Sequence, residues 1–134
     1  MPVQVKIINQ STNILPGYAT AGAAGMDIRA NLSEPIILKS LERRMVPTGL
    51  FIEMPEGYEG QVRPRSGLAN KHGITCLNSP GTVDSDYRGE IKIILINLSD
   101  QTQTINHGDR IAQLVVAKIE QVNLQLVHQL NLTQ

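Results

Sequence analysis

Short β-type segments, interrupted by proline and glycine, follow one another along nearly the whole chain. Each segment is apolar or alternates apolar with polar residues, which is the pattern of strands with one or both faces covered. Prolines and glycines between them are typical turn or strand-limiting residues. We predict strands at 3–8, 25–32, 35–39, 44–55, 58–64, 73–77, 90–98, 101–106 and 109–119. Many short strands at this spacing favour an all-β fold, either closed or built from two sheets.

Two segments allow a more specific prediction. Residues 66–73, "SGLANKHG", contain helix formers between Ser66 and Gly73, so we expect about two helical turns with the serine as the cap and the glycine as the stop. Residues 90–98, "EIKIILINL", are almost continuously apolar, as expected of a strand covered on both faces.

Length and charge limit the possible functions. A chain of 134 residues without a linker or repeat is predicted to form one domain over residues 1–134. Its 12 basic and 12 acidic residues cancel, and no basic stripe is present, so we expect no nucleic-acid partner. A small phosphorylated ligand stays possible, because it needs only a local positive cluster. Cys76 is the only cysteine, which excludes an intramolecular disulfide and a four-cysteine zinc site.

The chain carries no targeting or membrane signal that we can identify. Its first ten residues are too polar for a signal peptide, and no apolar run approaches the roughly 20 residues of a membrane span. We therefore predict a cytoplasmic protein with no membrane partner. Only three tyrosines and one phenylalanine are present, and there is no tryptophan. A site for a nucleobase would have to rely on hydrogen bonds rather than on stacking.

Two stretches in the first half could take part in chemistry. In "GAAGMDIRA", residues 22–30, Asp27 begins an otherwise apolar strand after a small-residue loop, and a turn-forming aspartate is the simpler interpretation. In "RPRSGLAN", residues 63–70, Arg65 precedes Ser66 and Gly67 at a predicted helix start. A hydroxyl, exposed amides and a guanidinium suit a phosphate, but a capped helix with surface arginines explains the stretch equally well.

The hairpin region "LNSPGTVDSDYRGE", residues 77–90, is the most polar stretch. Asp84 and Asp86 lie two apart, so an extended chain would place both on one face. An ionised aspartate can orient and deprotonate a water, and hairpin backbone groups can bind a flat base. Acidic turns are nevertheless usually just solvated, and the local chemistry alone favours that interpretation.

The fourth stretch, "HGDRIAQLVV" at residues 107–116, contains Gln113 inside an apolar strand. A buried side-chain amide needs a hydrogen-bond partner. Gln113 therefore either hydrogen-bonds another group in the core or contacts a phosphate of a ligand. The three histidines lack metal-pair spacing and are expected to lie on the surface.

In order and spacing, these four stretches resemble the motifs of the trimeric deoxyuridine triphosphatase (dUTPase) family, from about residue 21 to residue 114. The resemblance implies a distorted jelly-roll-like β-barrel with one short helix, assembled as a homotrimer with active sites between subunits. It also implies hydrolysis of dUTP to dUMP and pyrophosphate by attack of water on the α-phosphorus. That reaction would keep uracil out of DNA and supply dUMP for thymidylate synthesis.

The resemblance also implies roles for residues of the hairpin region. Asp84 is expected to be catalytic, because it matches the aspartate that activates the water and meets the sugar 3′-hydroxyl. Tyr87 matches the ring that packs on deoxyribose and leaves no room for a 2′-hydroxyl. Asp86, with Arg88 and Glu90, is expected to support the hairpin and a subunit contact. The positions that match the uracil-reading hairpin are Asn78, Gly81, Thr82 and Val83.

Further roles implied by the resemblance concern the triphosphate. Asp27 matches an aspartate that supports the metal–phosphate region. Mg²⁺ is expected as the cofactor, held mainly by the triphosphate and water, so we predict no direct protein ligand. The positions that match phosphate contacts are Arg65, Ser66, Gly67 and Gln113.

The chain departs from the family pattern at its C-terminus. The family's fifth motif, an arginine followed by a glycine-rich segment with an aromatic, has no counterpart here, since no arginine follows Arg110 and no glycine follows Gly108. We therefore expect near-normal folding and trimer formation but strongly reduced turnover, because the segment that closes over the nucleotide is missing. Two other functions stay open: that of the related dCTP deaminases, and that of a catalytically silent nucleotide-binding module with the same fold. The tyrosine in "VDSDYRGE" favours the hydrolase over the deaminase.

Overall fold

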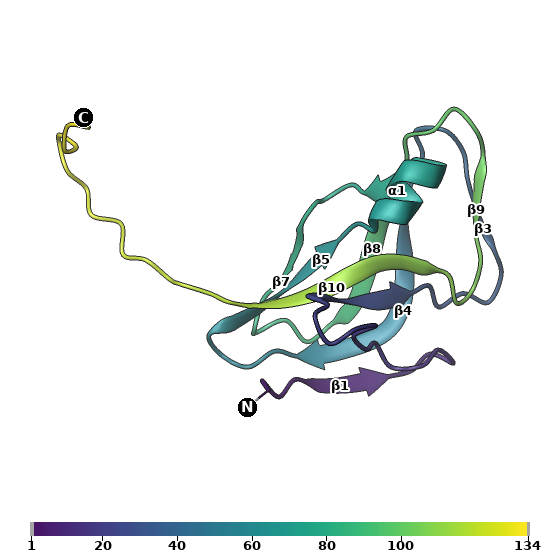
Figure 1. Cartoon of the computed structure of the whole chain (residues 1–134), viewed down its shortest axis with the longest axis horizontal. Coiled ribbons are helices and arrows are strands. Elements are labelled where there is room, and N and C mark those ends of the chain that lie inside the picture. The colour runs from purple at the N-terminus through teal and green to yellow at the C-terminus, as the bar shows by residue number, and fades with distance from the viewer. Residues whose placement is uncertain (1, 134) are drawn as a thin grey trace.

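The computed structural model describes residues 2–133, which form antiparallel strands and one short helix (Figure 1). All of the segments predicted as strands contain one, and a further strand forms in the hairpin region. The elements are β1 (Lys6–Asn9), β2 (Gly25–Arg29), β3 (Ile36–Leu38), β4 (Arg43–Glu53), β5 (Tyr58–Arg63), α1 (Ser66–His72), β6 (Ile74–Cys76), β7 (Gly81–Val83), β8 (Glu90–Asn97), β9 (Gln103–Ile105) and β10 (Arg110–Lys118).

The strands form two four-stranded sheets and one two-stranded ribbon. One sheet has the order β1-β4-β8-β6, the other has the order β2-β10-β5-β7, and β3 pairs with β9. All of these pairings are antiparallel. The predicted double-sheet, jelly-roll-like fold with one short helix is therefore confirmed.

Alternating residues from both sheets fill an aliphatic core. On β8, Ile91, Ile93 and Leu95 are buried, while Lys92 between them is exposed. Thr48 and Asn97 are the buried polar side chains of the described residues, and both are hydrogen-bonded to main-chain oxygens. The core therefore needs no aromatic side chain and leaves no unpaired polar atom among the described residues.

The prediction that residues 90–98 are covered on both faces was wrong for the single chain. One face of β8 is in the core, but on the other face Lys92 is exposed and Ile94 is only half-buried. Met45, the register partner of Ile94 on β4, is 55% exposed. The two strands thus present an apolar outer face that this chain alone does not cover.

The helix differs from its prediction at one end. The N-cap is Arg65, in an extended conformation and without a side-chain capping bond, and Ser66 is already the first helical residue. The expected serine cap was therefore wrong, because a cap must keep the extended geometry that here belongs to the preceding residue. The glycine stop is confirmed: Gly73 is left-handed, with φ 67°, and its N–H donates to the carbonyl of Ala69.

Residues 121–133 form an extended segment that leaves the body of the sheets after β10 (Figure 1). Every side chain in this segment is exposed, including Leu124 at 94%. Apolar surface of this kind is costly to leave in water. Within residues 2–133, no helix has the length and apolar character needed to cross a membrane.

Candidate functional site

The hairpin region forms a small hollow beside β7, with a volume of about 230 Å³. Its floor is apolar and comes from both sheets, including Val62 of β5 and Ile91 of β8. Asp84, which is expected to meet the sugar 3′-hydroxyl, lies in the turn after β7 and does not line this hollow. The structure does bring together the other residues predicted to contact uracil and sugar. These residues are Asn78, Gly81, Thr82, Val83 and Tyr87.

β7 lies at the edge of its sheet and pairs only with β5. An edge strand leaves one row of N–H and C=O groups free for another partner. Gly81, at the start of β7, lets the Asn78 side chain approach, because a Cβ at position 81 would lie 3.1 Å from Asn78 Nδ2. Free backbone groups beside a side-chain amide can hydrogen-bond the edge of a flat base.

The turn after β7 carries Asp84 and Tyr87. The N–H of Tyr87 donates to the carbonyl of Asp84 at 3.1 Å, and the Tyr87 hydroxyl donates to the carbonyl of Glu90 at 2.7 Å. The hydroxyl end of the ring lies against Gly89, where a Cβ would be 2.6 Å from the hydroxyl oxygen, so a side chain at position 89 would push the exposed ring aside. The Asp84 carboxylate is exposed and has no hydrogen-bond or ion-pair partner within residues 2–133. It is therefore available to a water.

A second group of charged side chains surrounds Asp27 on β2. Its Oδ1 accepts a hydrogen bond from Arg65 Nε at 3.0 Å, and its Oδ2 lies 3.7 Å from Arg110 Nη1. Gln113 on β10 is the register partner of Asp27, and Gly25 leaves the space that the Gln113 side chain occupies. Two guanidiniums share one carboxylate here, so the group has excess positive charge and suits an anion. Arg110 was not among the predicted site residues, although its motif was recognised.

Ser66 and Gly67 follow Arg65 on the first turn of α1, and both are exposed. Because Ser66 does not cap the helix, its hydroxyl stays free for an external partner. A Cβ at Gly67 would meet nothing within 4 Å, so the fold of the single chain does not itself require glycine there. Both positions fit an approach by a ligand from outside.

The hollow next to this second group has a volume of about 300 Å³ and is lined by Arg65 and Arg110 together with Asp109 and His72. A larger hollow, of about 480 Å³, lies elsewhere, between β1, β2 and β10. Its lining contains no charged side chain, and Ile7, Leu15 and Met26 are among its apolar walls. It is therefore unsuited to a triphosphate.

The two groups lie far apart within one chain. Val83, just before Asp84, is the register partner of Gly60 near the start of β5, whereas Arg65 follows the end of β5. About five residues at ~3.3 Å each place these ends roughly 15 Å apart. In addition, β2 and β7 are the opposite edges of their sheet. A single chain therefore does not converge all of the predicted residues on one point.

The described residues contain no cluster of three or more His, Cys, Asp or Glu side chains that could hold a metal ion. Both oxygens of Asp27 face arginines. Cys76 is buried in β6, and this burial raises the pKa of its thiol to about 11, so it is not a nucleophile at neutral pH.

Comparisons with known sequences show which family the chain resembles. A family profile described as dUTPase matches residues 5–134. The deoxyuridine 5′-triphosphate nucleotidohydrolase of Cytophaga hutchinsonii is 60% identical over 131 residues, which cover 98% of this chain and 85% of the relative. The enzyme of the same name from Fusobacterium nucleatum is 61% identical over 132 residues, covering 98% and 90%.

Solved structures give the same result for the fold. The dUTPase from phage phi11 of Staphylococcus aureus superposes with a TM-score of 0.82 at 26% identity, covering 95% of this chain and 97% of the phage chain. A Staphylococcus bacteriophage 80alpha dUTPase, solved with dUpNHpp, superposes with a TM-score of 0.86 at 23% identity, covering 98% and 92%. Motifs, fold and relatives together lead to one conclusion: the chain belongs to the dUTPase family.

Proposed function

We propose that this protein hydrolyses dUTP to dUMP and pyrophosphate at sites formed between subunits of a homotrimer. The observation that carries the proposal is the hairpin hollow, in which the free edge of β7 and Asn78 lie beside Tyr87. The exposed Asp84 follows Val83 in the turn next to this hollow. The names of the Cytophaga and Fusobacterium relatives support the same substrate and reaction.

In this proposal, the hairpin selects the nucleoside. The free edge of β7 and the Asn78 amide hydrogen-bond the polar edge of uracil, while Val62 and Ile91 provide an apolar floor. The Tyr87 ring lies against the deoxyribose, held by its hydroxyl on Glu90 and by contact with Gly89. A ring fixed on both sides is suited to exclude a 2′-hydroxyl, because it cannot easily move aside.

Asp84 performs the proton step. Its carboxylate accepts a hydrogen bond from a water, orients it in line and takes its proton as the water oxygen bonds to the α-phosphorus. The bond between the α-phosphorus and the bridging oxygen breaks, and pyrophosphate leaves with the bonding electron pair.

The positive group around Asp27 binds the phosphates. Arg65 and Arg110 supply charge, the Ser66 hydroxyl and Gln113 amide supply neutral donors, and Asp27 holds both arginines in place. Gly67 allows the phosphates to approach the chain closely. Because this group lies roughly 15 Å from Asp84 in one chain, by the strand rise, we assign it to a neighbouring subunit's substrate.

Mg²⁺ is proposed to arrive with the substrate. The absence of a three-ligand cluster among the described residues, and the engagement of Asp27 by two arginines, fit an ion that is held by triphosphate oxygens and water. Such an ion would neutralise charge on the phosphates, which suits a chain of net charge zero.

Exposed apolar surface supports the homotrimer. The outer face of β4 and β8 carries Met45 and Ile94, which also line the hairpin hollow. The C-terminal segment carries alternating exposed leucines. The apolar hollow between β1, β2 and β10 offers complementary surface on the same chain. A second and third copy would cover what one chain leaves in water.

The test is pyrophosphate release from dUTP in the presence of Mg²⁺. We expect release by the wild-type protein, and a loss of at least about 100-fold in kcat for Asp84→Asn, which keeps the shape but cannot take a proton. Asp100→Asn, at an exposed aspartate in the loop between β8 and β9, is the matched control and should change kcat by less than about threefold.

Three results would contradict this function. Full activity in Asp84→Asn would remove the aspartate from the proton step. Conversion of dCTP to dUTP or dUMP would indicate a deaminase, and an absence of turnover by the wild-type chain would leave a nucleotide-binding module.

A further inference from the structure

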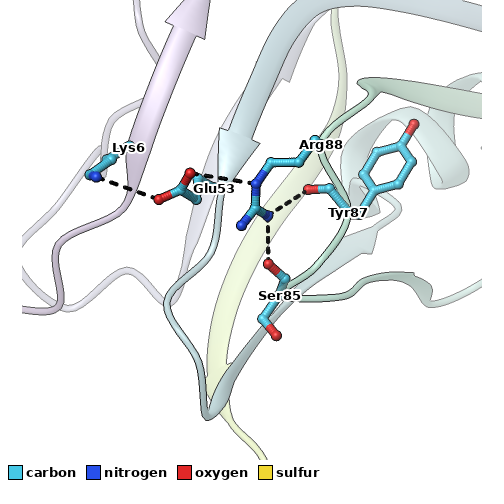
Figure 2. A network of polar contacts seen from close by, with 5 residues as sticks. All are labelled: Lys6, Glu53, Ser85, Tyr87 and Arg88. Atoms are coloured by element: carbon cyan, nitrogen blue, oxygen red, sulfur yellow. Dashed lines mark hydrogen bonds and ion pairs between the residues drawn. The ribbon is translucent and has the colours of Figure 1, made fainter.

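A network of ionic and polar contacts joins the Asp84–Tyr87 turn to the opposite sheet (Figure 2). Arg88 lies at its centre. One nitrogen of its guanidinium, Nη1, donates to the carbonyl of Ser85 at 2.6 Å and to the carbonyl of Tyr87 at 3.3 Å. A single side chain thus holds two main-chain oxygens of the turn.

The other side of the same guanidinium faces β4. Arg88 Nε lies 3.4 Å from Glu53 Oε1, at the last residue of β4, and Glu53 Oε2 lies 3.5 Å from Lys6 Nζ. Lys6 and Glu53 are register partners on β1 and β4. The chain itself runs from β7 of one sheet through this turn into β8 of the other sheet, and Arg88 adds a side-chain link from the turn to the β1–β4 strand pair beside β8.

The network is expected to contribute little to the stability of the fold. The side chains of Arg88 and Lys6 are 55% and 84% exposed, and exposed ion pairs stabilise a fold very little. A guanidinium has several N–H donors in fixed directions within one plane. It can therefore bind carbonyls on one side and a carboxylate on the other, which fixes their relative positions. Lysine, with a single ammonium point, cannot reproduce that arrangement.

We propose that Arg88 is a positioning residue, which sets the place of Asp84 and Tyr87 by holding the turn between them, and that Glu53 orients Arg88. This inference rests on the proposed function, since it assigns a role through Asp84 and Tyr87. The turn is otherwise closed only by the bond from the Tyr87 N–H to the Asp84 carbonyl and by the Tyr87 hydroxyl. Small displacements of a catalytic group reduce rates strongly, by about 100-fold for ~1 Å.

The decisive variant is Arg88→Lys, which keeps the charge and removes the fork. We expect kcat for dUTP to fall by about 10- to 100-fold while KM changes less, because the lost quality is alignment. The ratio of kcat/KM for dUTP to that for UTP should fall as well, since the Tyr87 carbonyl loses its partner. Glu53→Gln should reproduce both changes more weakly.

Matched controls separate positioning from general damage. Lys6→Gln removes the outer end of the network and should leave kcat and discrimination unchanged. Arg44→Lys repeats the substitution at another exposed arginine, on β4, and should also behave as wild type. Thermal unfolding midpoints of all four variants should match the wild type.

A readout without substrate completes the test. Hydrogen–deuterium exchange of the Tyr87 amide should be faster in Arg88→Lys than in wild type, and unchanged in Lys6→Gln. Wild-type kcat and discrimination in Arg88→Lys would overturn the inference while leaving the proposed function intact. An inactive wild-type protein would overturn both.

Discussion

At the scale of single residues, the shape of the hairpin site depends on two glycines and a tyrosine. Gly81 admits the Asn78 amide, and Gly89 admits the Tyr87 ring. Neither glycine has a positive φ, so both are needed for space and not for backbone conformation. Glycine at these positions therefore leaves room for a neighbouring side chain, Asn78 in one case and Tyr87 in the other.

Removal of the Tyr87 ring should relax the choice of sugar. For Tyr87→Ala we expect the kcat/KM ratio of dUTP to UTP to fall at least about tenfold, because nothing then occupies the space beside C2′. Steady-state kinetics with both nucleotides measure the ratio. Tyr87→Phe keeps the ring and loses only the bond to Glu90, so it should retain most of the discrimination. An unchanged ratio in Tyr87→Ala would show that another group excludes ribose.

At the scale of elements, the long strand β4 is interrupted by a bulge that Glu90 fastens. The register with β8 shifts between Pro47 and Phe51, and Glu90 Oε2 accepts hydrogen bonds from the N–H groups of Thr48 and Gly49 inside the shift. The main-chain carbonyl of Glu90 also accepts a hydrogen bond from the Tyr87 hydroxyl. The bulge in one strand and the ring over the hollow are thus coupled through one residue.

Gly49 should be the glycine that least tolerates a side chain. Its φ is 70°, and a Cβ would lie 2.9 Å from the backbone nitrogen of Ser11. We expect Gly49→Ala to lower the free energy of unfolding by roughly 2–4 kcal/mol, from left-handed strain and the clash together. Urea denaturation measures the change. Gly22→Ala, at a site with nothing within 4 Å, is the control and should stay near wild type.

The strands could be predicted from the sequence because alternation and turn residues are local signals. The sequence predicted which residues belong to the site but not how they are arranged in space. That arrangement depends on which strands become neighbours, and this is a long-range property. Nothing local shows that Glu53 will meet Arg88, or that Arg110 will share Asp27 with Arg65. The serine cap failed for a local reason: side-chain chemistry suggested Ser66, but the extended residue is Arg65.

At the scale of the whole molecule, the exposed leucines of residues 121–133 are surface that the proposed homotrimer would cover. Analytical ultracentrifugation should give about three times the 14.7 kDa chain mass. Leu124→Ser with Leu126→Ser should shift this equilibrium toward smaller species, because it removes apolar surface available to a neighbour. Leu41→Ser, at an exposed leucine in the turn before β4, is the control. A monomeric wild-type protein that hydrolyses dUTP would contradict the shared site.

The distance between the two ends of β5 has a genetic consequence. In the proposed homotrimer, a subunit with a defective hairpin would still offer intact phosphate-binding residues to its neighbour, and a subunit with defective phosphate-binding residues would still offer an intact hairpin. Two different inactive alleles expressed in one cell would therefore restore working sites in mixed trimers. With random mixing of equal amounts, about a quarter of all sites would combine an intact hairpin with intact phosphate-binding residues. Because β5 separates the two groups of residues, each proposed site would use residues of two subunits, and a defect in one subunit would impair a site that it shares with its neighbour.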